Sequence, residues 1–165
     1  MTIAERLRSD DFQVVRKALD ELTSLPSAES LPMLEQLALE PNPPSRGYAL
    51  DGMARVSAER AKALAFRYLE DPAWNVRTGA IHYFCETRDA DAVPQVSRIL
   101  LNDPDEITRT WSAIYLGEVG DESVFPALME AARHDTGVNH EGTPIRQIAH
   151  DSIEKIKARL SSPDA

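Results

Sequence analysis

Apolar residues recur along this chain at helical spacing, and the helical runs come in pairs. Within residues 103–133, Ala113, Leu116 and Val119 lie on one face of a predicted helix. A break follows at Gly120, and a second helical run begins at Val124. Apolar positions three and four residues apart mark the buried face of a helix. The unit of the chain is therefore one helix, a tight turn and a second helix.

The landmarks of this unit recur with a nearly constant period. Successive arginines are 30, 31 and 32 residues apart, and the helix-breaking Asp-Pro or Glu-Pro pairs keep the same interval: Arg16, Arg46, Arg77 and Arg109; Glu40-Pro41, Asp71-Pro72 and Asp103-Pro104. A period in this range indicates stacked helical hairpins, each of which exposes too much apolar surface to be stable alone. The sequence predicts an all-α solenoid of about five stacked hairpins.

The pattern also predicts the ends of the array. Thr2 and Glu5 have capping-box spacing, so we expect a short capping helix over residues 3–8. The period then slips at an insertion, residues 134–144, after which Thr143 as N-cap and Pro144 in the first turn predict a final helix. We expect one domain, 1–160, with a tail at 161–165 and repeats near 10–40, 41–70, 71–102, 103–134 and 144–160.

Composition indicates the cellular compartment in which we expect the protein. No apolar run approaches the ~20 residues that cross a bilayer, and the first residues mix charged and apolar side chains without the apolar core of a signal peptide. The single cysteine, Cys85, excludes internal disulfides and fits a reducing compartment. We expect a cytoplasmic protein.

Charge is unevenly distributed. Residues 70–142 carry 14 acidic and 5 basic residues, which equals the net charge of −9 of the whole chain. A concentrated negative field repels nucleic acid and anionic membrane and favours encounter with a basic protein. We therefore expect a basic protein partner, no nucleic acid, no membrane, and a monomer when free. The other interpretation is that the acidity only keeps the protein soluble.

Two stretches carry a family resemblance. The first is Asp71-Pro-x-x-x-Val76-Arg77 followed by Val93-Pro94, and the second is Asp103-Pro followed by Arg109, Leu116-Gly-Glu-Val-Gly-Asp121 and Val124-Phe-Pro126. They resemble the short HEAT-repeat class and are similar to the HEAT-like repeats of phycocyanobilin lyases. The resemblance covers nearly the whole chain and implies a protein-binding scaffold, most often bacterial. It also implies enzymatic relatives: lyase subunits, DNA glycosylases and a metal-dependent hydroxylase.

The enzymatic alternatives find little support in the residues. A glycosylase needs a basic groove, whereas the central repeats are acidic, and the hydroxylase type carries several His-Glu pairs, of which this chain has His140-Glu141. The insertion and His150 supply oxygen and imidazole groups, but their spacing matches no zinc or calcium loop. No nucleophile with a base and no phosphate loop appear. We predict no catalytic residue, no cofactor and no metal site.

Candidate partner contacts fall into four groups. Solenoids usually bind through the second helix of each pair, which gives Gln95, Arg98, Asn102, Glu130, Arg133 and His134. The acidic start of the fourth repeat gives Asp103, Asp105 and Glu106, and the insertion gives Asp135, Asn139, His140 and Glu141. Interface-type aromatics are Trp111 and Tyr115, which would form a surface strip and for which packing between repeats is the alternative, and Trp74, which we expect to be more exposed than Trp111.

The arginine series has a structural interpretation. Rather than an anion-binding ladder, we expect its members to pair with acids such as Asp71 and Asp103 and so to lock adjacent repeats.

The sequence thus predicts a non-enzymatic protein-protein interaction module. Its acidic third and fourth repeats and the loop 134–143 would bind a basic partner, and an inhibitor or immunity protein is the narrower version. A lyase-type or metal-dependent enzyme subunit and an assembly-factor scaffold are the alternatives.

Overall fold

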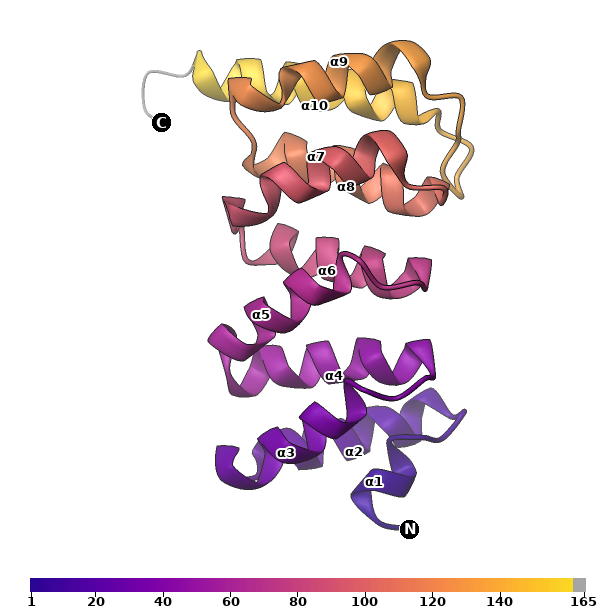
Figure 1. Ribbon diagram of the computed structural model, residues 1–165, viewed down its shortest axis with the longest axis vertical. Coiled ribbons are helices and arrows are strands. Elements are labelled where there is room, and N and C mark those ends of the chain that lie inside the picture. The colour runs from indigo at the N-terminus through magenta and orange to yellow at the C-terminus, as the bar shows by residue number, and fades with distance from the viewer. Residues whose placement is uncertain (162–165) are drawn as a thin grey trace. The chain divides into compact units, whose positions relative to one another are not determined.

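The structure, a computed structural model, describes residues 1–161 and is entirely helical in type (Figure 1). Within that range it has ten α-helices, two short 3-10 helices and no β-strand beyond one isolated bridge. The predicted all-α class is confirmed. Contacts between Cα atoms group the chain into two compact units, residues 1–68 and residues 69 onward, which are described separately. Of the predicted tail, residues 162–165 lie outside the described range.

The first unit contains a short helix and two helical hairpins. In order these are α1 (Ile3–Arg6), α2 (Phe12–Ser24), α3 (Ser27–Leu37), α4 (Pro43–Val56) and α5 (Ala58–Tyr68). The predicted capping box is present, since the Thr2 hydroxyl accepts from Glu5 N at 3.2 Å and Thr2 N donates to the Glu5 carboxylate at 2.7 Å. Helix α1 packs on α2, and α4 packs on α2, α3 and α5, which buries Leu19, Leu22 and Leu34.

The second unit contains two hairpins and a closing helix. These are α6 (Trp74–Glu86), α7 (Val93–Asn102), α8 (Glu106–Val119), α9 (Phe125–His134) and α10 (Ile145–Leu160). A 3-10 turn at Ala90–Ala92 precedes α7, and another at Glu122–Val124 precedes α9. Both α7 and α9 have a proline in their first turn. Proline suits these positions because the first helical N–H groups have no partner within the helix.

Two layers build the second unit. First helices pack on one another, α6 on α8 and α8 on α10, while α7 packs on α8 and α9, and α9 packs on α10 (Figure 1). The core between them contains Phe84, Leu100, Leu116, Leu128 and Ile156, each essentially inaccessible to solvent. Helix α8 thus packs against α6, α7 and α10, and α10 closes the described part of the array.

Helix α10 also donates hydrogen bonds to the carbonyl groups at the C-terminal end of α8, a contact that the sequence did not predict. Arg159 Nη1 donates to the carbonyls of Gly117 at 3.1 Å and Glu118 at 3.0 Å, and its Nη2 donates to the Gly120 carbonyl. The last carbonyls of a helix lack intrahelical partners and attract cations. Arg159, near the end of α10, therefore caps α8.

The start of α10 differs from prediction by one residue. The helix begins at Ile145 with Pro144 as the N-cap, and no side chain caps it. Thr143 does not serve as the cap because the preceding loop holds it: Thr143 N donates to the Asn139 side chain at 2.8 Å, and Thr143 O accepts from Asn139 N at 2.9 Å.

Among the helices of residues 1–161, none combines the length and apolar character that a bilayer-spanning helix requires.

Candidate protein-binding groove

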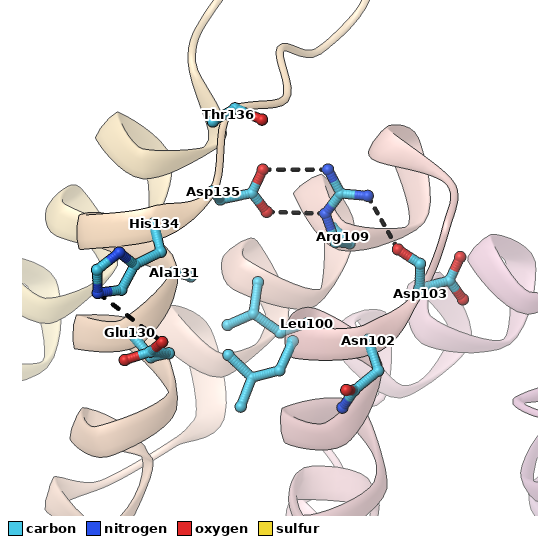
Figure 2. A pocket seen from close by; sticks show the side chains of 10 residues that line it. Leu100, Asn102, Asp103, Arg109, Glu130, Ala131, His134, Asp135 and Thr136 are labelled. Carbon is cyan, nitrogen blue, oxygen red and sulfur yellow. Dashed lines mark hydrogen bonds and ion pairs between the residues drawn. The ribbon is translucent and has the colours of Figure 1, made fainter.

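A groove of about 480 Å³ runs between α7 and α9 in the second unit and is hereafter the α7–α9 groove (Figure 2). Its floor is apolar, and polar groups surround it. The lining residues are Leu100, Leu101, Asn102, Asp103, Arg109, Glu130, Ala131, His134, Asp135 and Thr136. Three of these residues are apolar and seven are polar or charged, so the groove offers more polar contacts than a typical small-molecule pocket.

Of the five predicted contact residues that line this groove, three lie on α7 and α9: Asn102, Glu130 and His134. Each is exposed, and they come from the C-terminal turns of α7 and α9. His134 Nε2 lies 3.9 Å from Glu130 Oε1 (Figure 2). Asn102 Nδ2 donates to Arg98 O at 2.8 Å, which fixes the side chain on the last turn of α7. The structure thus brings residues from two repeats into one surface.

Asp103 requires a correction, because it is buried and paired inside the protein. Its carboxylate accepts from Arg77 Nε at 2.7 Å and Arg77 Nη2 at 2.8 Å, and also from Asp105 N at 2.9 Å. The Asp103 side chain is 4% exposed. This confirms the interpretation of Arg77 as a lock between adjacent repeats and removes the Asp103 carboxylate from the contact surface.

The same correction applies to Asp135. Arg109 Nε and Nη2 donate to its two carboxylate oxygens at 2.7 and 3.0 Å, and Arg109 Nη1 donates to Asp103 O at 2.9 Å (Figure 2). The side chain of Asp135 is 8% exposed. The Arg109–Asp135 pair is therefore the next copy of the Arg77–Asp103 pair, and it holds the insertion onto α8.

Stability at acid pH should depend on Asp135. Burial alone would raise the pKa of Asp135, but hydrogen bonds from Arg109 and from Gly137 N outweigh it and lower the pKa below its usual value. The unfolded chain then binds the proton more readily, so the stabilisation is fully present above the unfolded pKa of about 3.9 and is lost as pH falls through the folded pKa. We expect Asp135→Asn to cost about 2–3 kcal/mol at pH 7, and this difference to shrink below about pH 4.

Urea unfolding followed by tryptophan fluorescence at several pH values measures this effect in the second unit, because both tryptophans, Trp74 and Trp111, lie there. Glu122→Gln, a neutralised exposed acid of the same unit, is the control. A constant difference between wild type and Asp135→Asn down to the lowest pH would contradict the assignment.

The three predicted aromatic contact residues differ in how far they are buried. Tyr115 is fully buried, and its hydroxyl donates to Asp89 O at 2.6 Å, so the prediction that it forms part of a surface strip is corrected. Burial raises the pKa of this phenol. Trp111 is half-buried and stacks edge-on against His82 at 4.8 Å between ring centroids. Trp74, at the start of α6, is 48% exposed, as the sequence indicated.

Asp105 and Glu106 have different roles. Asp105 is the N-cap of α8, where its carboxylate accepts from Thr108 N at 2.9 Å. Glu106, the first residue of α8, is exposed. An N-cap aspartate stabilises its helix by about 1 kcal/mol, whereas Glu106 is free to face a partner.

The insertion is an ordered turn. The Asn139 side chain accepts from Glu141 N at 3.0 Å and Thr143 N at 2.8 Å, and Val138 bridges to Pro144. Gly142 adopts a positive φ of 83°, which favours glycine. Asn139 is therefore half-buried inside the loop, while His140 and Glu141 are exposed. We call residues 103–106 and 135–143 the loop edge.

The remaining second-helix residues lie beside the α7–α9 groove. Gln95 and Arg98 line another groove of about 450 Å³ that also borders α7, together with Asn102 and with Asp71 and Arg77. Arg133 is exposed on α9. The exposed surface of α7 and α9 thus extends across two adjoining grooves.

The negative charge does not lie on these helices. Their charged residues, histidine aside, are Arg98, Glu130 and Arg133, and ten of the 14 acidic residues in 70–142 lie in the segments between α-helices. Six aspartates in these segments accept a hydrogen bond from a backbone N–H two or three residues later: Asp71, Asp89, Asp103, Asp105, Asp121 and Asp135. Much of the acidity therefore builds turns, and the exposed glutamates are the acids left for a partner.

The described residues contain no cluster of metal-ligating side chains. Within residues 1–161, no three His, Cys, Asp or Glu side chains lie close enough together to hold a metal ion.

Sequence reasoning missed the apolar and small residues of the α7–α9 groove. Leu101 is 44% exposed although it neighbours the buried Leu100, and Thr136 forms part of the wall. A signal was present: Leu101 lies outside the stripe formed by Val96 and Leu100, and a leucine outside the buried stripe of a short amphipathic helix faces solvent or a partner.

Comparison with protein families decides the class. The model of HEAT repeats matches residues 39–113 and 62–139, which together span more than half of the chain. The chain belongs to the HEAT-repeat family. Its HEAT repeats coincide with the hairpins from α4 to α9, which include the α7–α9 groove. HEAT repeats are solenoid units that expose extended surfaces for other proteins, so the coarse function is that of an interaction scaffold.

Among solved structures, the HEAT-repeat chain is similar to a crystal structure described as an engineered protein. The TM-score is 0.52 at 17% identity, with 98% of this chain and 90% of that chain covered. At this identity the likeness shows the fold alone. No curated protein matches the sequence.

Proposed function

We propose that this HEAT-repeat chain is a non-catalytic module that binds a basic partner protein through the loop edge and the α7–α9 groove. The observation that carries the proposal is the juxtaposition of exposed carboxylates with a preformed groove. Glu130 lines the groove, and Glu106 and Glu141 are exposed on the loop edge, which contributes Asp103, Asp135 and Thr136 to the lining. Exposed charges of one sign speed encounter with an opposite surface, and a rigid concave floor reduces the entropy lost on binding.

The proposed setting is the cytoplasm, with the chain monomeric when free. The single cysteine, Cys85, is partly buried, and burial raises the pKa of its thiol. An inhibitor or immunity protein is the narrower version, because electrostatic steering gives the fast capture that such a role requires.

Charge reversal at the loop edge tests this proposal. In affinity capture from native lysate, we expect Glu106→Lys/Glu130→Lys/Glu141→Lys to recover a basic partner about tenfold less well than wild type, and high salt to release the partner from wild type. These glutamates are used because Asp103 and Asp105 hold the fold together. An activity assay of the recovered partner then distinguishes an inhibitor from a scaffold.

The matched control carries the same charge change in the first unit: Asp10→Lys/Glu29→Lys/Glu59→Lys, three exposed acids. It should recover the partner as wild type does. If both triple variants bind equally well, the acidity serves solubility and the proposed surface is wrong.

A further inference from the structure

The first unit has a groove of its own between α3 and α5, hereafter the α3–α5 groove. Its volume is about 360 Å³, and Met53 of α4 contributes to its lining. The lining residues are Glu35, Ala38, Leu39, Met53, Arg60, Ala63, Leu64 and Arg67. The groove is separate from the α7–α9 groove and shares no residue with it.

Positive charge dominates this groove in a chain whose net charge is −9. Arg60 and Arg67 are seven residues apart on α5, which places them on the same face two turns apart. Arg60 pairs with Glu35. Arg67 is exposed, and no hydrogen bond or ion pair within residues 1–161 engages its side chain. The groove therefore keeps one guanidinium group available to a ligand.

An apolar patch lies between these charges. Leu39 is 72% exposed just beyond the end of α3, and Ala63 is exposed on α5 between the two arginines. Met53 and Leu64 are buried beneath them. A large aliphatic side chain left this accessible beside a concavity is an apolar anchor point for a ligand side chain.

We propose that the α3–α5 groove binds an acidic segment of a partner protein, with an aliphatic side chain on Leu39 and a carboxylate on Arg67. Guanidinium groups pair with carboxylates through two parallel hydrogen bonds, which gives both affinity and orientation. Nucleic acid is the poorer fit, because a single unpaired guanidinium group neutralises few phosphates and no aromatic side chain lines the groove for base stacking. The proposal does not depend on the function proposed for the second unit.

Selection from a library of random phage-displayed peptides tests the site directly. Wild-type protein should enrich peptides that place Asp or Glu within a few residues of Leu, Ile, Val or Phe. For the best peptide, made with a fluorescent label, we expect Arg67→Glu to weaken binding about tenfold and Leu39→Ser to weaken it severalfold, as measured by fluorescence anisotropy. A peptide with lysine in place of its critical acid should bind Arg67→Glu better than it binds wild type.

Arg146→Glu is the matched control, since it makes the same charge change at an exposed arginine on α10, outside both grooves. Its affinity for the peptide should stay within about twofold of wild type. Circular dichroism confirms that each variant is folded.

Several results would overturn the proposal. They are enrichment of basic or uncharged peptides, no enrichment at all, equal weakening by Arg67→Glu and Arg146→Glu, and tighter binding of a labelled single-stranded oligonucleotide than of any peptide. Self-association that Arg67→Glu abolishes would also overturn it, because the occupant would then be a second copy of the chain.

Discussion

Replacing Asp103 by alanine is expected to lower the free energy of unfolding of the second unit by about 3–4 kcal/mol. The substitution leaves the guanidinium of Arg77, whose side chain is 12% exposed, without the carboxylate that binds it through two hydrogen bonds. Those hydrogen bonds are the largest cause of the raised pKa of Arg77. Removing one partner of a buried pair is costly because the remaining charge stays desolvated. The Asp105 N–H also loses its acceptor.

Urea unfolding followed by tryptophan fluorescence measures this loss, and two further variants locate its cause. Asp103→Asn retains an acceptor for Asp105 N–H and removes the charge, so it should lose less stability than Asp103→Ala. Glu122→Ala, an exposed acid of the same unit, should stay within about 0.5 kcal/mol of wild type. A similarly small effect of Asp103→Ala would return Asp103 to the list of surface contacts.

Adding one methyl group at Gly117 should destabilise the second unit by about 2 kcal/mol. Here α8 and α10 lie so close that a Cβ on Gly117 would stand 2.7 Å from Ser152 Oγ, 2.8 Å from its Cβ and 3.1 Å from its Cα. Ser152 Oγ donates to Ala113 O at 2.8 Å, and this hydrogen bond would also be disturbed. A side chain can rotate away, but a backbone Cα cannot, so the two helices must separate. This outweighs the gain of about 1 kcal/mol in helix propensity.

Gly79→Ala is the matched control for Gly117→Ala. Gly79 lies inside α6, and a Cβ there would meet nothing within 4 Å. It should therefore stabilise the unit by about 0.8 kcal/mol through helix propensity alone. The same Gly→Ala change would then lower the free energy of unfolding at Gly117 and raise it at Gly79. Adding Ser152→Gly to Gly117→Ala should restore part of the loss; stabilisation by Gly117→Ala alone would show that the helices are not in close contact.

The turns of the hairpins were predictable because their chemistry is local. The capping box at Thr2 and Glu5 and the prolines after the 3-10 turns act on residues no more than four positions away. The start of α10 was misplaced by one residue because Asn139 engages Thr143 through the folded insertion. The local sequence around Thr143 and Pro144 does not show that Asn139 hydrogen-bonds Thr143.

The candidate site was predictable in part. Asn102, Glu130 and His134 follow from the rule that second helices line the surface, and they meet in one groove. For Asp103 the sequence supported both pairing with an arginine and contact with a partner, and for Tyr115 both packing between repeats and a surface contact, and it did not decide between them. Their partners, Arg77 and the Asp89 carbonyl, are each 26 residues away along the chain. Pairs at that distance become neighbours only when repeats stack.

By itself, the sequence determined that this protein is an array of HEAT hairpins with a closing helix and an acidic second half, since helical periodicity, caps and repeat spacing are properties of the chain. Tertiary structure decided which of its charges face solvent. Six aspartates accept hydrogen bonds in turns, and two of these are buried against Arg77 and Arg109. Glu106, Glu130 and Arg67 stay exposed. The physical reason is that burial and ion pairing depend on the neighbouring repeat, and a charge in one repeat does not specify its partner in the next.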